Sequence, residues 1–143
     1  MGALKTYLDT SVLVAMFTPD ATSARADRLL AQGAIVPAIS DWARAEFAAA
    51  VARKVRTGDV TADGAQVAFS EFDVWLARVG PTANALPADI EASSTWLRRL
   101  DLGLRAPDAL HISIALRTAD ALATFDQKMA EAAKQLGCRV VPA

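Results

Sequence analysis

Apolar residues along the chain follow two periods, and the two periods alternate. Short runs that are mostly apolar or β-branched have the length of buried strands and are bounded by Asp, Gly, Pro or Ser. They predict strands over residues 4–8, 35–38, 83–86, 121–124 and 139–141. Longer segments between them carry apolar residues at spacings of three and four, which is typical of helices. The predicted helices cover residues 12–17, 22–32, 40–56, 61–79, 88–100, 107–118 and 127–136.

Residues with strong boundary preferences support these limits. Ser40 is a suitable N-cap for the helix that runs to about Arg56, and Gly58 follows that helix as a C-terminal signal. Pro107 opens a later helix. Helix 61–79 is predicted to bury one side that carries most of its large apolar residues. That side consists of Val67, Phe69, Phe72, Trp75, Leu76 and Val79.

Strands that alternate with helices predict a parallel sheet with helices on both faces. The sequence therefore indicates an α/β fold, a three-layer α/β/α domain around a central, mostly parallel sheet of about five strands. The chain has 143 residues, of which 53% are hydrophobic, and this is the size of one compact domain with a sizeable core. Residues 1–143 are accordingly predicted to form a single domain.

Overall charge and composition narrow the setting of the protein. A net charge of −1 and a pI near 5.8 give no global attraction to nucleic acid, so a polyanionic partner would need a local basic patch or a bound metal. Cys138 is the single cysteine and cannot form an internal disulfide. The N-terminus lacks signal-peptide features, and no apolar run approaches about 18 residues. We therefore expect a cytoplasmic protein with no membrane segment.

Four carboxylates stand at positions where an apolar chain rarely places them. Asp9 directly follows the first predicted strand, and Asp126 lies just beyond strand 121–124. In parallel α/β sheets, ligands gather beyond the carboxyl ends of the strands, near the point where strand order reverses. Asp108 occupies the first turn of a helix, and Glu46 would come from a neighbouring helix. These four residues are therefore predicted to share one site.

Each of these carboxylates also has an ordinary structural explanation. Asp9 and Asp126 could cap the helices that follow them, and Asp108 could interact with a helix dipole for about 0.3–1 kcal/mol. Glu46 is harder to explain, because its neighbours one helical turn away are apolar and include no cation. These neighbours are Trp42, Ala43, Ala49 and Ala50.

Convergence of the carboxylates would itself favour a metal ion. Each close pair would repel by roughly 4 kcal/mol at 4 Å with an effective dielectric near 20. Oxygen ligands without a Cys or His cluster favour hard cations, here Mg²⁺ or Mn²⁺, over zinc. His111, the single histidine, lies three residues after Asp108 on the same predicted helix. It is either a hydrogen-bond partner beside the metal ligands or a packed core residue.

The remaining acidic residues that begin turns or helices are interpreted as structural. Asp41 is a plausible partner of a helix dipole in the first turn after Ser40. Four others are predicted to be solvated or to act as caps. These are Asp20, Asp89, Asp101 and Asp120.

Four segments of the chain carry a resemblance to a known family. They are YLDTSVLVAMF at 7–17, ARAEFAAAVAR at 43–53, APDALHISIAL at 106–116 and ALATFD at 121–126. In this order and at these separations, they resemble the PIN-domain nucleases, and within them the VapC toxins of bacterial type II toxin–antitoxin modules. The resemblance spans nearly the whole chain, whereas each segment alone is a weak signal. It implies a PIN-like fold.

The resemblance also implies roles for individual residues. All four acidic positions of the family have a match, as metal ligands and catalytic residues, in Asp9, Glu46, Asp108 and Asp126. Thr10 or Ser11 matches the hydroxyl position beside the first aspartate, and Ser11 would support the coordination shell. Thr124 matches the threonine that commonly precedes the last aspartate. No expected acidic position is missing, so the motif does not indicate an inactive member.

The implied reaction is metal-dependent endonucleolytic hydrolysis of RNA. In such reactions one or two Mg²⁺ or Mn²⁺ ions activate a water for in-line attack and stabilise the departing 3′ oxygen. Cations near the site would hold the phosphate backbone. The candidates are Arg44, Arg53, Lys54, Arg56, Arg98, Arg99 and Arg105.

The resemblance further implies a homodimer and a cognate VapB-like antitoxin whose C-terminal segment blocks the acidic cleft. Helix 61–79 carries enough aromatic surface for a partner groove, although burial in its own core is the commoner use of such residues.

Three other functions remain compatible with the sequence. One is a PIN-fold nuclease that processes RNA outside a toxin–antitoxin pair. Another is a non-catalytic RNA-binding module, which would leave Glu46 unexplained. The third is a receiver-type phosphoacceptor domain, but that fold expects paired acids after the first strand, and Asp9 is followed by Thr10.

Overall fold

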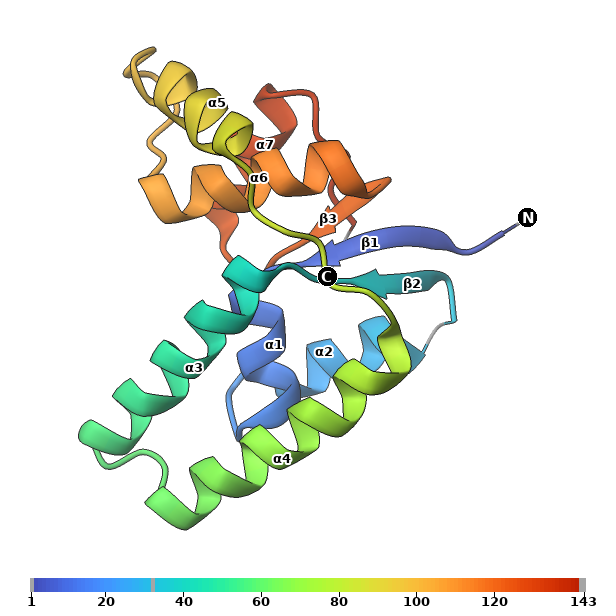
Figure 1. The fold of residues 1–143 in the computed structure, drawn as a ribbon, viewed down its shortest axis with the longest axis vertical. Coiled ribbons are helices and arrows are strands. Elements are labelled where there is room, and N and C mark those ends of the chain that lie inside the picture. Colours follow the sequence, from blue (N-terminus) through green and yellow to red (C-terminus); the bar gives the residue numbers. More distant parts are fainter. Residues whose placement is uncertain (1, 32, 142–143) are drawn as a thin grey trace.

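The computed structural model describes residues 2–31 and 33–141 and is shown in Figure 1. Its strands are β1 (Leu4–Leu8), β2 (Ile35–Ala38) and β3 (Ala121–Ala123). Its helices are α1 (Thr10–Phe17), α2 (Ser23–Ala31), α3 (Asp41–Arg56), α4 (Ala62–Val79), α5 (Pro87–Leu97), α6 (Ala106–Thr118) and α7 (Gln127–Gln135).

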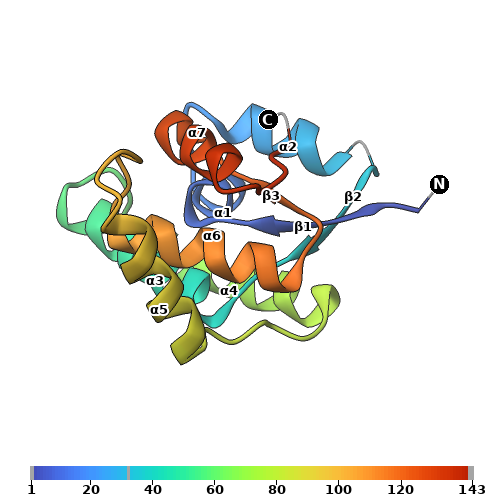
Figure 2. The same ribbon diagram turned by 90° about the horizontal axis from the view of Figure 1, so that it is seen from above.

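The three strands form a parallel sheet in the order β2-β1-β3. Tyr7 of β1 lies opposite Ala38 on one side and Leu122 on the other. Figure 1 shows α1, α2, α3 and α4 on one face of the sheet and α5, α6 and α7 on the other, and Figure 2 gives the view turned by 90°. The predicted three-layer α/β fold is therefore confirmed. Because β1 is central and its neighbours come from later parts of the chain, its carboxyl end is the point where strand order reverses.

The two predicted edge strands of the sheet are each reduced to a single bridge. Segment 83–86 contributes only a parallel bridge between Ala83 and Ser40, and segment 139–141 contributes only a bridge between Val140 and Leu122. The first segment ends because Leu86 already caps α5, which begins at Pro87. In the part of the chain that the structure describes, three strands with two single bridges at the edges thus replace the expected sheet of about five strands.

Helix ends follow the boundary signals closely. The Ser40 side chain accepts a hydrogen bond from the Ala43 amide at the start of α3, and Thr61 caps α4 in the same way. Helix α5 ends at Leu97 rather than near Leu100, which has a positive φ of 67° that a helix does not allow. The predicted helix end at Gln32 lies outside the described residues.

The core consists of two apolar clusters that use alternate residues of β1. Leu8 packs with residues of α1, α3 and α4, whereas Tyr7 packs with residues of α6 and α7. Phe72 of α4 is buried in the first cluster, as predicted. Val67 was predicted to lie on the same side but is 57% exposed, so the buried face of α4 is narrower than the sequence indicated. Among the described residues, no helix combines the length and apolar character that a bilayer crossing requires.

Candidate active site

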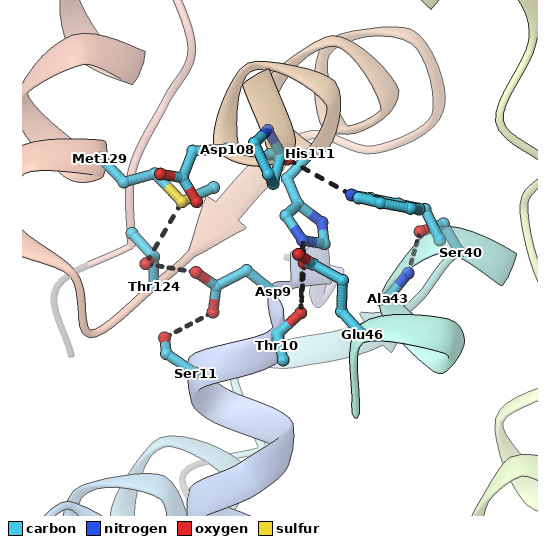
Figure 3. Close-up of polar contacts among 12 residues, drawn as sticks. Asp9, Thr10, Ser11, Ser40, Ala43, Glu46, Asp108, His111, Thr124 and Met129 are labelled. Atoms are coloured by element: carbon cyan, nitrogen blue, oxygen red, sulfur yellow. Dashed lines mark hydrogen bonds and ion pairs between the residues drawn. The ribbon is translucent and has the colours of Figure 1, made fainter. Parts of the chain in front are cut away.

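The four predicted site carboxylates line one cavity of about 830 Å³. Asp9 follows β1 and Asp126 follows Phe125 beyond β3, so both lie at the carboxyl edge of the sheet. Glu46 comes from α3 and Asp108 from the first turn of α6. Figure 3 shows Asp9, Glu46 and Asp108 grouped near the first turn of α1. Four acidic residues that are far apart in the sequence are therefore brought together, as predicted.

Asp9 is held at the base of this cavity by hydroxyl groups and one amide. It is the N-cap of α1, and its Oδ1 accepts hydrogen bonds from Ser11 Oγ at 2.6 Å and from the Val12 amide at 3.2 Å. Thr124 Oγ1 donates to Oδ2 at 2.5 Å. Asp9 is only 3% exposed, and this burial raises the pKa of its carboxyl despite the hydrogen bonds that oppose the shift. The capping role and the site role are thus both met by one residue.

Glu46 has a partner that its own helix does not provide. His111 Nε2 of α6 contacts Glu46 Oε1, and Thr10 Oγ1 donates to the same oxygen at 2.8 Å. Burial alone would raise the pKa of Glu46, but the hydrogen bonds from His111 and Thr10, together with the positive charge of Arg105, outweigh it and lower the pKa. His111 is both packed, at 1% exposed, and a partner of the site, although it bonds to Glu46 rather than to Asp108.

Asp108 lies where negative charge is crowded. Arg105 Nε lies 3.4 Å from Asp108 Oδ2, on a guanidinium that is largely exposed. Burial raises the pKa of Asp108; Arg105 opposes that shift, and the charge of Asp126 adds to it. The charge of Asp126 is therefore close enough to disfavour the ionised form of Asp108.

Ser11 and Thr124 join the loops that carry the site. Ser11 Oγ donates to Asp9 and accepts a hydrogen bond from the Phe125 amide at 3.0 Å. Thr124 Oγ1 donates to Asp9 and accepts from the Asp126 amide at 3.1 Å. Both hydroxyls consequently tie the end of β1 to the loop after β3. Thr124 belongs to the site through these hydrogen bonds. The sequence indicated a role for Thr124 only through the family resemblance.

A basic rim borders the acidic part of the cavity. We use this name for the four cations that line it, Arg53, Lys54, Arg56 and Arg105. The first three come from the last turn of α3, where cations also interact favourably with the helix dipole. Arg44, Arg98 and Arg99 do not line this cavity: Arg98 borders a second cavity and Arg99 pairs with Asp101. The structure thereby selects four of the seven predicted phosphate-binding candidates.

Asp89 does not match its predicted solvated role. It does cap α5 by accepting a hydrogen bond from the Leu86 amide, but it is only 1% exposed. Arg117 makes a two-point ion pair with it, at 2.7 and 3.1 Å, and Ser113 donates a third side-chain hydrogen bond. The sequence indicated the capping role of Asp89 but not its ion pair, because Arg117 lies 28 residues away on another helix. Asp101 and Asp120, in contrast, belong to exposed contacts, as expected.

The donor set of the cavity fits a hard divalent cation in chemistry. All four acidic residues offer oxygen atoms, and these are the ligands that Mg²⁺ and Mn²⁺ prefer. Within residues 2–31 and 33–141, no three His, Cys, Asp or Glu side chains are already arranged to hold a metal ion. The carboxylates instead have protein partners, which a cation would have to share or displace. Mutual repulsion at Asp108 and Asp126 is the feature that a cation would relieve.

Comparisons with known proteins agree with this architecture. A family model described as PIN domain matches residues 6–135. Ribonuclease VapC45 of Mycobacterium tuberculosis is 31% identical over 140 residues, which cover 96% of this chain and 94% of that protein.

Solved structures show the same fold. Mycobacterium tuberculosis VapC20, described as a Sarcin-Ricin loop cleaving toxin, matches with a TM-score of 0.72 at 21% identity, over 90% of this chain and 95% of that chain. VapBC2 from Rickettsia felis, bound to a DNA fragment from its promoter, matches with a TM-score of 0.66 at 19% identity, over 96% and 98% of the two chains. The family model over residues 6–135 and the 31% identical relative show that the chain belongs to the PIN domain family and, within it, to the VapC ribonucleases.

Proposed function

We propose that the protein is a divalent-cation-dependent endoribonuclease that hydrolyses RNA phosphodiester bonds and is neutralised by a cognate VapB-like antitoxin. The observation that carries the proposal is the convergence of Asp9, Glu46, Asp108 and Asp126 on one cavity beside a basic rim. An acidic centre next to exposed cations suits a substrate that is a polyanion, provided that a divalent cation offsets the carboxylate charge.

The proposed cofactor is Mg²⁺, with Mn²⁺ as an alternative. Asp9, Glu46, Asp108 and Asp126 would hold it, and when bound it would supply Lewis-acid activation of water and stabilise the oxygen that leaves. Ser11 and Thr124 orient Asp9 by donating to its two oxygens, at 2.6 and 2.5 Å. Such partners of metal ligands typically change metal affinity or activity by about 10–100-fold when they are lost.

The basic rim is proposed to hold the RNA backbone. Arg53 and Arg56 are exposed at the end of α3, and Arg105 is exposed at the start of α6, so all three can reach a phosphate at the mouth of the cavity. Lys54 is less available, because its Nζ lies 3.8 Å from Asp20 Oδ2. Backbone contacts of this kind position a nucleic acid and carry little sequence information.

Two macromolecular partners complete the proposal. A cognate antitoxin is supported by the match to the Rickettsia felis VapBC2 structure, which contains both members of such a pair. A homodimer is proposed on the resemblance to the family. Sedimentation or light scattering of the purified chain, alone and with the product of an adjacent small gene, would measure both associations.

The test of the activity is RNA cleavage by the purified chain with Mg²⁺ or Mn²⁺, compared with EDTA. Wild type should cut RNA only with the cation, and Glu46→Gln should be folded but inactive. Cleavage that persists in EDTA or in Glu46→Gln would contradict the proposed mechanism. Binding of RNA without cleavage of any substrate would favour a non-catalytic RNA-binding module, and cleavage without a neighbouring antitoxin gene would favour an RNA-processing nuclease.

A further inference from the structure

A buried chain of hydrogen bonds runs from the start of α3 to the carboxylate of Glu46 on the same helix. Ser40 Oγ lies 2.6 Å from Tyr7 Oη, and Tyr7 Oη lies 2.7 Å from His111 Nδ1. On the other side of the imidazole ring, His111 Nε2 contacts Glu46 Oε1. Ser40, Tyr7 and His111 are each at most 1% exposed. This series of hydrogen bonds therefore crosses the core and ends in the cavity described above.

The partners at each end fix the direction of the hydrogen bonds. Ser40 Oγ already accepts a hydrogen bond from the Ala43 amide, so its hydroxyl hydrogen is available to Tyr7. Tyr7 in turn can donate to His111 Nδ1, and the remaining ring N–H at Nε2 then points at a carboxylate, which accepts. Every hydrogen along the chain has an acceptor in this arrangement.

The reverse direction leaves groups unsatisfied. If Nδ1 carried the hydrogen, Tyr7 would have to donate to Ser40, and the Ser40 hydroxyl hydrogen would have no acceptor among the described residues. In a neutral ring, the lone pair of Nε2 would also face the oxygen of Glu46. Burial raises the pKa of Tyr7 far above its usual range, which keeps the phenol in the form that donates.

From this geometry we propose that Tyr7 and His111 are positioning residues for Glu46, acting through a directed relay from Ser40 to Tyr7, then to Nδ1 of His111, and from its Nε2–H to Glu46 Oε1. The expected effect of the relay on metal binding and cleavage rests on the proposed function, whereas the direction of its hydrogen bonds does not. In the described part of the chain, the side-chain hydrogen bonds to Glu46, from His111 and Thr10, both reach Oε1. The relay thus fixes the carboxylate while Oε2 is left for a ligand in the cavity.

The relay joins residues from three elements and holds the imidazole ring of His111 in place. Tyr7 belongs to β1, His111 to α6, and both Ser40 and Glu46 to the α3 segment, at its cap and in its second turn. Tyr7 and Trp42 also pack against the imidazole, with ring centroids 5.7 and 6.3 Å away. A ring held on both nitrogens and by two aromatic neighbours has one orientation. Such restraint is what a metal ligand needs from its surroundings.

The first test uses wild-type protein and the fact that the chain has a single histidine. Nitrogen-15 NMR of labelled histidine reports which ring nitrogen carries hydrogen, without any assignment problem. For the neutral ring, the relay predicts hydrogen on Nε2 and none on Nδ1. A neutral ring with its hydrogen on Nδ1 would overturn the proposal whether or not the protein cuts RNA.

A matched pair of variants separates positioning from packing. In His111→Gln the side-chain amide nitrogen occupies the place of Nε2 and can still donate to Glu46, whereas in His111→Asn the amide lies near the place of Nδ1 and cannot. We expect Mn²⁺ affinity, measured by electron paramagnetic resonance, to fall by about tenfold or more in His111→Asn, and to stay within about threefold of wild type in His111→Gln. Equal losses in the two variants, or no loss in His111→Asn, would overturn the positioning role.

Activity assays on the same variants distinguish this inference from the proposed function. The loss in His111→Asn should appear in kcat, with KM for RNA nearly unchanged, because the basic rim is intact. If wild type neither binds Mn²⁺ nor cuts RNA while the NMR result agrees with the relay, the nuclease proposal fails and the hydrogen-bond direction stands. If wild type cuts RNA and the neutral ring carries its hydrogen on Nδ1, the nuclease proposal stands and the relay fails.

Discussion

Two buried aspartates, Asp9 and Asp89, are treated in opposite ways by the rest of the molecule. Both lie at helix N-termini, and they are 3% and 1% exposed. Asp89 receives a two-point ion pair from Arg117, which outweighs burial and lowers the pKa of its carboxyl. Asp9 receives hydroxyl and amide hydrogen bonds but no ion pair among the described residues, and burial raises its pKa.

A structural carboxylate and a site carboxylate therefore differ in the source of their balancing charge. A buried charge is costly unless it is paired, and a chain that uses Asp for stability alone also supplies the cation. Arg117 fills this role for Asp89. At Asp9 the hydroxyls orient the carboxylate without neutralising it, next to Glu46, Asp108 and Asp126 in the same cavity. That arrangement is expected where the balancing charge comes from outside the chain.

The largest expected effect is on cleavage by Asp9→Asn. Loss of a metal ligand should lower kcat/KM for RNA by at least about 100-fold, the upper end of the effect of losing a partner of a ligand. The thermal midpoint should stay at or above that of wild type, because the substitution removes a buried charge whose pKa is raised by burial. Activity within tenfold of wild type would place Asp9 with the structural aspartates.

The complementary variant, Asp89→Asn, should destabilise the fold and spare the chemistry. Removing the charge leaves Arg117 unpaired and breaks charge-assisted hydrogen bonds, at a cost of about 2–3 kcal/mol in the free energy of unfolding. Urea unfolding would measure this loss. At a temperature where the variant is folded, its cleavage rate should equal that of wild type, and a strong loss of activity there would argue against a purely structural role.

The contribution of Asp89 to the free energy of unfolding should also depend on pH, with a smaller effect than the substitution itself. The folded-state pKa of Asp89 lies below its ordinary value of 3.8, so the unfolded chain binds the proton more readily. The stabilisation is therefore fully present above about pH 4 and is lost as the pH falls through the folded-state pKa. The difference in unfolding free energy between wild type and Asp89→Asn should shrink as the pH is lowered below 4. A constant difference down to pH 2 would contradict this assignment.

The smallest effect concerns the basic rim. Arg53→Gln should raise KM for RNA by about two- to fivefold, since an exposed ionic contact contributes about 0.2–1 kcal/mol, with little change in kcat. The slope of log affinity against log salt should also fall by about one. Arg99→Gln is the matched control, because Arg99 pairs with Asp101 away from the cavity. Equal effects of the two substitutions would show that the rim has no special role.

Much of the site could be predicted because its residues break local patterns. Asp9 and Asp126 end strands of a parallel sheet, and Glu46 stands in an apolar helical segment, so their convergence followed from the architecture. Their capping roles, offered as alternatives, turned out to coexist with a place in the cavity. For these residues, local and site functions are compatible because one oxygen can accept from an amide while the carboxylate still lines the cavity.

Contacts between distant elements were beyond the sequence. The partner of Glu46 is His111, 65 residues away, and the partner of Asp89 is Arg117 on another helix. Neither pairing has a spacing that a single sequence can reveal. The length of the segment 83–86 was mispredicted for a related reason. A short apolar segment forms a full strand only if the next helix begins late enough, and here Leu86 is already the N-cap of α5. Val67 was misplaced because helical period alone does not give the width of a buried face.

Whether this cavity binds a metal ion is tested by Mn²⁺ binding to wild type, Asp9→Asn and Asp89→Asn, followed by electron paramagnetic resonance under conditions where all three proteins are folded. Wild type and Asp89→Asn should bind Mn²⁺ with similar affinity, and Asp9→Asn should bind it at least about tenfold more weakly. Undiminished binding by Asp9→Asn, or an absence of binding by wild type, would show that this cavity is not a metal site.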